Sequence, residues 1–166
     1  SANSILYAAI DQASARNNRI QNGAATARGI TYTLNRTVVG DLRVEENINL
    51  RNVSVTTTDS PLRTVSISDN PNFDLSGIVA TDSIRDAIRI NASSTNTVGS
   101  QRSDVTNLRI AGNTISGNLA NTNTANGIVL SLTDSNLGDY TVPYAGARIA
   151  GNLIRNLSGT ANNPSA

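Results

Sequence analysis

Two stretches of the sequence decide the fold: Leu108-Arg-Ile110-Ala-Gly-Asn113-Thr-Ile115 and Ala147-Arg-Ile149-Ala-Gly-Asn152-Leu-Ile154. In both, apolar residues stand at the first, third and last positions, with Ala-Gly-Asn between them. Alternation of apolar with other residues is typical of a half-buried β-strand, and Gly and Asn favour corners in the backbone. The pattern therefore predicts two short strands joined by a tight corner.

Two further segments superpose on these without gaps, namely Ile48-Asn-Leu50-Arg-Asn-Val53-Ser-Val55 and Phe73-Asp-Leu75-Ser-Gly-Ile78-Val-Ala80. A second set of strands alternates with the first along the chain: Val65-Ser-Ile67, Ile88-Arg-Ile90 and Ile128-Val-Leu130. Units that hold two or three short strands and stack on one another form a solenoid. We expect inward columns in which Leu50 lies under Leu75, Ile110 and Ile149, and Val55 under Ala80, Ile115 and Ile154.

The composition agrees with a parallel β-helix. Aromatic residues are only 3% of the 166, whereas Asn occurs 23 times. Stacked aliphatic side chains fill a narrow bore without aromatic rings, and Asn tolerates left-handed corners. Asn113 and Asn152 occupy the same corner and are predicted to form a short amide ladder. The alternative is an antiparallel β-sandwich, which is also built from short strands and polar turns.

The N-terminal segment is expected to be a helix over about 4–18. Ser4 is a suitable N-cap, and Ile5, Leu6, Ala9, Ile10 and Ala13 follow at helical spacing. The sequence thus predicts one all-β domain, 1–166, with a capping α-helix and stacked coils over about 28–157. Nothing comparable to this helix follows Ile154, so we expect an open last coil and a chain that is a fragment of a longer β-helix.

Several kinds of chemistry are excluded by composition. The chain has no Cys and no His, and all 13 positive charges are Arg. Thiol and Ser-His-Asp catalysis, Cys- or His-ligated metals and Schiff bases are therefore absent. The formal net charge of +1 argues against a nucleic-acid partner, and no apolar run is long enough to span a membrane. No regular Asp spacing indicates calcium, so we expect neither a metal nor another cofactor.

The segments Ser4-Ile-Leu-Tyr-Ala-Ala-Ile-Asp-Gln-Ala and Gly29-Ile-Thr-Tyr32, together with the two Ala-Gly-Asn corners, resemble right-handed parallel β-helices of the pectate-lyase-like superfamily. The resemblance covers almost the whole chain. It implies a right-handed β-helix related to polysaccharide lyases, glycoside hydrolases and bacteriophage tailspike depolymerases. Tailspikes of this fold are trimers, so the resemblance also implies a homotrimer on a virion surface, or a secreted extracellular enzyme.

One outward column is the first candidate site. The residues between the first two apolar positions of each repeat are Asn49, Asp74, Arg109 and Arg148. If the register holds, Asp74 and Arg109 are cross-strand neighbours. They would then act as a catalytic carboxylate beside a cation that holds an acidic sugar. The other reading is a surface salt bridge of about 0–1 kcal/mol.

Asp86 is the further catalytic candidate, because glycoside hydrolysis needs two carboxylates. Arg89 and Arg148 are candidates for binding substrate. Tyr140 and Tyr144 lie in a long connection, where they would either stack on sugar rings or cover the edge of the bore. The sequence thus predicts a carbohydrate-directed β-helix acting on a bacterial or uronic-acid polysaccharide. The alternative is a non-catalytic structural or adhesive solenoid that associates through its open C-terminal coil.

Overall fold

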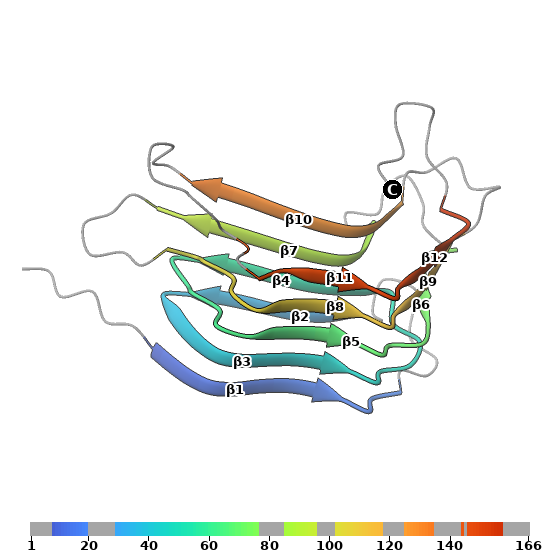
Figure 1. Cartoon of the computed structure of the whole chain (residues 1–166), viewed down its shortest axis with the longest axis horizontal. Helices are drawn as coiled ribbons and strands as arrows, with labels where there is room; N and C mark the ends of the chain where they lie inside the picture. The colour runs from blue at the N-terminus through green and yellow to red at the C-terminus, as the bar shows by residue number, and fades with distance from the viewer. Residues whose placement is uncertain are drawn as a thin grey trace, which may run out of the picture.

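The computed structural model describes residues 8–19, 29–76, 85–95, 102–117, 125–134, 144 and 146–157. These residues form twelve strands in three sheets, and every pairing between named strands is parallel. The chain passes from one sheet to the next and returns to the first one coil further on (Figure 1). This arrangement is that of a parallel β-solenoid, and it rules out the antiparallel sandwich.

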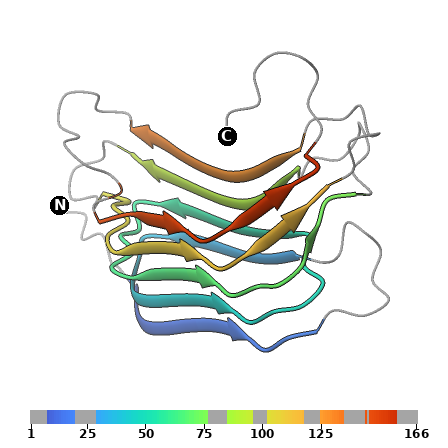
Figure 2. The same cartoon turned by 45° about the vertical axis from the view of Figure 1, so that its right-hand side comes forward.

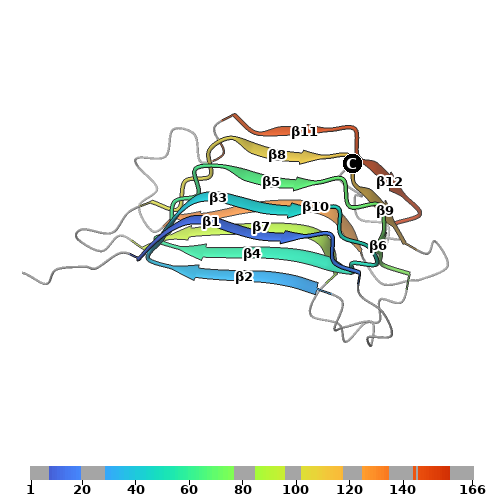
Figure 3. The ribbon, with the colours of Figure 1, turned by 90° about the horizontal axis from the view of Figure 1, so that it is seen from below.

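The five-stranded sheet consists, in spatial order, of β1 (Ala8–Arg16), β3 (Thr37–Glu45), β5 (Val65–Ser68), β8 (Leu108–Ala111) and β11 (Arg148–Ala150). The four-stranded sheet consists of β2 (Gly29–Asn35), β4 (Asn52–Thr58), β7 (Asp86–Ser94) and β10 (Asn126–Asp134). The three-stranded sheet consists of β6 (Phe73–Asp74), β9 (Thr114–Ser116) and β12 (Leu153–Arg155). Figures 2 and 3 show the last sheet continuing from the first around a corner.

The core is a set of aliphatic columns that run along the bore. Within each column, a side chain from one coil packs on its counterpart in the next, about 4.8 Å away. The side chains at the centre, such as Ile67, Ile88 and Ile110, are completely buried. Representative columns are Ala15-Val44-Ile67-Ile110-Ile149, Leu50-Phe73-Ile115-Ile154 and Ile30-Val53-Ile88-Ile128.

The predicted register is correct for the last two repeats and wrong for the first two. Ile110 pairs with Ile149, and Ile115 with Ile154, as expected. However, Leu50 lies under Phe73 in the three-stranded sheet, not in the Ile110 column. Val55 belongs to the four-stranded sheet, and Leu75 directly follows β6 in place of joining the Ile110 column. Ala80 lies outside the described residues. The gapless superposition failed because the same alternation of apolar residues occurs on more than one side of a coil.

The predicted capping helix is also wrong over the described residues, because 8–16 form strand β1. Ala and Ile at helical spacing also suit a strand, and pairing with the whole of β3 outweighs the local helical preference. The two strands approach closely at Gly40, where a Cβ atom would lie 2.7 Å from the carbonyl oxygen of Asp11. Residues 4–7 of the expected helix lie outside the described part of the chain.

A ladder of five asparagines lines the corner that follows the five-stranded sheet. The Nδ2 of Asn18 donates to the Oδ1 of Asn47 at 2.9 Å, and the backbone N–H of Asn47 donates to the Oδ1 of Asn70 at 2.9 Å. The Nδ2 of Asn70 donates to the Oδ1 of Asn113 at 2.8 Å, and the Nδ2 of Asn113 donates to the Oδ1 of Asn152 at 2.9 Å. The amides therefore satisfy backbone groups that leave the strand pairing at a buried corner. The ladder predicted for two residues extends over five coils.

The residue before each ladder asparagine has a left-handed backbone. These residues are Asn17, Glu46, Asp69, Gly112 and Gly151, with φ between 55° and 67°. Gly adopts this conformation without steric cost, and Asn or Asp adopts it more readily than most residues. The repeated unit is therefore apolar, any residue, apolar, any residue, a left-handed residue and Asn.

Candidate functional site

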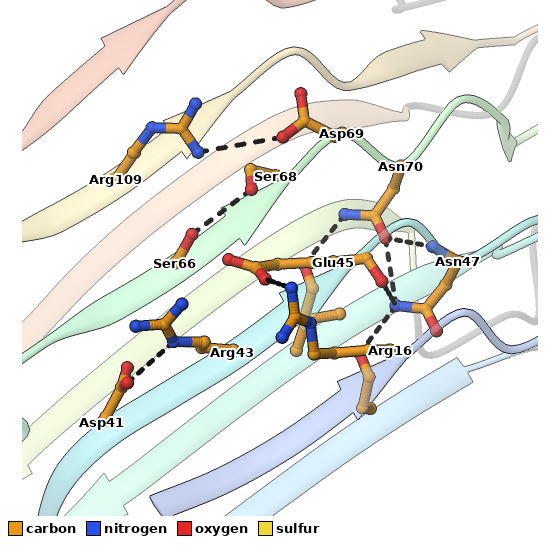
Figure 4. Close-up of polar contacts among 12 residues, drawn as sticks. Arg16, Asp41, Arg43, Glu45, Asn47, Ser66, Ser68, Asp69, Asn70 and Arg109 are labelled. Carbon is orange, nitrogen blue, oxygen red and sulfur yellow. Dashed lines mark hydrogen bonds and ion pairs between the residues drawn. The ribbon is translucent and has the colours of Figure 1, made fainter.

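The outer face of the five-stranded sheet carries three ion pairs: Arg16 with Glu45, Arg43 with Asp41, and the long contact of Arg109 with Asp69. One outward column consists of Ser14, Arg43, Ser66, Arg109 and Arg148, one residue from each strand. Neighbouring strands in a sheet are about 4.8 Å apart, so this column is a regular row along the long axis of the solenoid. Figure 4 shows its central part with the acidic side chains beside it.

The two halves of this column differ in charge balance. In the N-terminal half, the Nε of Arg43 contacts the Asp41 carboxylate at 2.7 Å, and Arg16 contacts Glu45 at 2.9 Å. The hydrogen bond with Asp41 raises the pKa of the Arg43 guanidinium above its ordinary value. These arginines are therefore neutralised by acids of the same face.

In the C-terminal half, Arg109 and Arg148 lie directly opposite each other on β8 and β11. The Arg109 side chain is 50% exposed, and its Nη1 lies 4.0 Å from Asp69, which is longer than a hydrogen bond. Within the described ranges, Arg148 makes no hydrogen bond or ion pair. Like charges on directly opposed strand positions repel, and the negative charge near these two arginines does not neutralise them both. An anion between the two guanidinium groups would relieve that repulsion.

Asp74 is not a neighbour of Arg109, and this expectation is corrected. Asp74 lies on β6 of the three-stranded sheet, opposite Ser116, whereas Arg109 is flanked by Ser66 and Arg148. The Oδ1 of Asp74 accepts the backbone N–H of Ser76 at 3.0 Å and its hydroxyl at 2.6 Å. This is a local turn that holds the carboxylate at the strand end. Asn49, also expected in the column, precedes the isolated bridge at Leu50 and lies elsewhere.

Asp86 and Arg89 lie together at the start of β7 in the four-stranded sheet. The Asp86 carboxylate is almost completely buried and accepts hydrogen bonds from the Nη1 of Arg89 at 2.8 Å and the Nδ2 of Asn126 at 2.7 Å. Arg89 therefore forms an ion pair with Asp86 in this structure. The three predicted catalytic residues, Asp74, Asp86 and Arg109, thus lie on three different sheets.

Tyr144 packs against the core beside strands β7 and β10. Its hydroxyl donates to the carbonyl oxygen of Ser131 at 2.7 Å, and its ring packs against the core. Of the two roles considered for this residue, the geometry favours covering the edge of the bore. Tyr140 lies outside the described residues.

Asp69, Asp41 and Arg43 also belong to the charged face, although the sequence pattern did not predict them there. The repeated unit contains a signal for two of them. Arg43 lies between the two apolar residues of its unit, as Arg109 does, and Asp69 is the left-handed residue before Asn70. Aligning the chain on Asn47, Asn70, Asn113 and Asn152 would have placed them correctly.

Comparison with known proteins yields no match to a family model, a curated protein or a solved structure. Across the described ranges, no three acidic side chains gather as they would to hold a metal ion. The part of the chain that the structure describes also contains no helix that would span a membrane.

Proposed function

We propose that this chain is a carbohydrate-directed β-solenoid that binds an anionic polysaccharide, such as a polymer containing uronic acid, along the outer face of the five-stranded sheet. The observation that carries the proposal is the exposed pair Arg109 and Arg148 on adjacent coils. A guanidinium group binds a carboxylate through two parallel N–H donors and remains charged at any physiological pH. A polymer lying along the solenoid axis would place successive acidic groups on successive coils.

The fold supports the same proposal. A parallel solenoid offers a long, flat surface with fixed spacing, and this suits an extended polymer better than a small molecule. The resemblance to pectate-lyase-like β-helices adds a second, independent support. Right-handed winding is part of the proposal, because crossovers between parallel strands are right-handed in nearly all proteins. So is a place outside the cell, at a cell or virion surface where such polymers occur.

The second candidate is a non-catalytic adhesive solenoid of the same fold. The placement of Asp74, Asp86 and Arg109 on three sheets favours it over a lyase or hydrolase within the described residues. Hydrolysis with inversion requires two carboxyl groups about 6.5–9.5 Å apart on either side of one sugar ring. The two predicted carboxylates instead support local turn and strand contacts on separate sheets.

The test is a binding assay on a panel of uronate-containing, sulfated and neutral polysaccharides. We expect the double variant Arg109→Gln/Arg148→Gln to weaken binding of the anionic polymers at least about tenfold, the loss of one or two charge-assisted hydrogen bonds. The matched control is Arg36→Gln/Arg155→Gln, which removes the same charge from exposed positions off this face. Equal losses in both double variants would reduce the effect to net charge and overturn the site.

Catalysis is measured in the same incubations. New reducing ends indicate hydrolysis, and unsaturated uronate absorbance indicates a lyase. Binding without either product supports the adhesive candidate. Absence of binding to every anionic polymer overturns the proposed function.

A further inference from the structure

Both ends of the described solenoid leave apolar side chains and strand edges uncovered. At the C-terminal end, Ile149, Ile154 and Leu153 are 49%, 44% and 52% exposed. At the N-terminal end, Ile10 is 37% exposed, although its partner Val39 is fully buried. Strands β1 and β11 are the outermost strands of the five-stranded sheet, and β2 and β10 are those of the four-stranded sheet. Free edges of this kind are templates for pairing with another chain.

The asparagine ladder gives the two ends opposite polarity. In each step, the backbone N–H of one asparagine points along the axis to the Oδ1 of the asparagine in the next coil, as from Asn47 to Asn70 and from Asn113 to Asn152. At the last step, the backbone N–H of Asn152 finds no acceptor among the described residues. At the first step, the Oδ1 of Asn18 receives no donor in the described part of the chain. One end therefore offers a donor, and the other offers an acceptor.

A second copy of the chain, translated along the axis, fits this pattern at the edge of the five-stranded sheet. Strand β1 of the second copy would pair with β11 in parallel. Because the four-stranded sheet has one strand fewer than the five-stranded sheet, the same translation leaves room for one strand between β10 and β2 of the second copy. In this register, Asn18 of the second copy takes the next position of the asparagine ladder after Asn152, and Ala15 of the second copy covers Ile149. The charges also agree: Arg148 would face Ser14 of the second copy, while Arg16 keeps its own partner Glu45 and lies over Ala150.

We propose that copies of this chain associate head to tail, with strand β1 of one copy pairing with strand β11 of the next. A contact between two identical ends would place donor against donor or acceptor against acceptor, and it would run the strands antiparallel. Because the contact is heterologous and the translation does not close a ring, it extends into a filament. This inference does not rest on the proposed carbohydrate function.

The experiment blocks each end separately with charge at residues that the structure leaves partly exposed. One variant carries Ile149→Lys and Ile154→Lys, and the other carries Ala15→Lys and Ile10→Lys. The full chain without substitution should form a concentration-dependent series of oligomers in sedimentation velocity over about a hundredfold concentration range, as mass action requires. Each blocked variant should sediment as a monomer.

The decisive sample is an equimolar mixture of the two blocked variants. Each retains one intact end, and these intact ends are complementary, so the mixture should give a 1:1 dimer and nothing larger. Circular dichroism and urea unfolding of each variant alone establish that it remains folded, and formation of the dimer is a second proof of folding. A monomeric unsubstituted chain, a discrete trimer unaffected by either variant, or a mixture that stays monomeric overturns the proposal.

Discussion

The asparagine ladder makes the sharpest stability prediction, at Asn70. This side chain is completely buried and makes four hydrogen bonds. Its Oδ1 accepts the backbone N–H of Asn47 at 2.9 Å and the Nδ2 of Asn47 at 3.1 Å. Its Nδ2 donates to the Val44 carbonyl oxygen at 3.1 Å and to the Oδ1 of Asn113 at 2.8 Å. No other side chain of that coil replaces these contacts among the described residues.

The substitution Asn70→Ala leaves the backbone N–H of Asn47 without its acceptor. A buried donor left unpaired costs about 1–3 kcal/mol, and each remaining neutral hydrogen bond that is lost costs about 0.5–1.5 kcal/mol. The other groups keep partial satisfaction, because Asn47 Nδ2 also reaches the Ala15 carbonyl and Asn113 Oδ1 keeps the Asn70 backbone N–H. We therefore expect a total loss of about 2–4 kcal/mol. For a domain of this size, that lowers Tm by roughly 5–15 °C.

The assay is urea unfolding followed by far-UV circular dichroism, with linear extrapolation to water. The control is Asn72→Ala, two residues further on. The Asn72 side chain is half-buried and makes one hydrogen bond, to Asn49 at 3.1 Å. It should cost less than about 1 kcal/mol. If Asn70→Ala costs no more than Asn72→Ala, the ladder is not what stabilises the corner, and the reasoning is refuted.

Three further predictions concern the bore, the corner and pH. Thr57 points into the bore, and its buried hydroxyl has no hydrogen-bond partner in the described part of the chain. Thr57→Val should therefore raise the free energy of unfolding, measured in urea melts, by about 1 kcal/mol. Thr56→Val, on the outer face, is the control and should change it by less than half of that. Gly112 has φ +67°, so Gly112→Ala should lower the free energy of unfolding by about 1–2 kcal/mol. Glu46→Ala, at the equivalent left-handed position of another coil, should be nearly neutral. Equal effects of the two substitutions would contradict the left-handed backbone at these positions. Burial raises the pKa of the Tyr32 hydroxyl, so the folded state holds this proton more tightly than the unfolded chain does. Because the chain has no His, Cys or Lys, its stability should change little from about pH 6 to pH 9. Stability should then fall as pH rises through the unfolded tyrosine pKa of about 10, and Tyr32→Phe should reduce the fall in Tm above that pH.

Local sequence determined which residues form strands and corners. The stretch 108–115 and its counterpart 147–154 fold as two strands around a left-handed glycine and a buried asparagine, as the alternation and the Gly-Asn pair predicted. These features depend on neighbours within a few residues, through steric limits on φ and the side-chain period of a strand. The same reasoning placed Arg109 and Arg148 side by side on the outer face.

The tertiary structure alone decided which strand lies on which side of the solenoid and whether the first described segment is a helix or a strand. Connections of different length separate the coils, so spacing along the chain does not fix the pairing of Leu50 with Phe73 or the distance of Asp74 from Arg109. Residues 8–16 carry a pattern that suits a helix or a strand, and the backbone hydrogen bonds offered by β3 select the strand. Asp69 reaches the neighbourhood of Arg109 for the same reason. Parallel pairing brings their coils into contact although Asn70 and Asn113, the adjacent ladder residues, are 43 residues apart in the sequence.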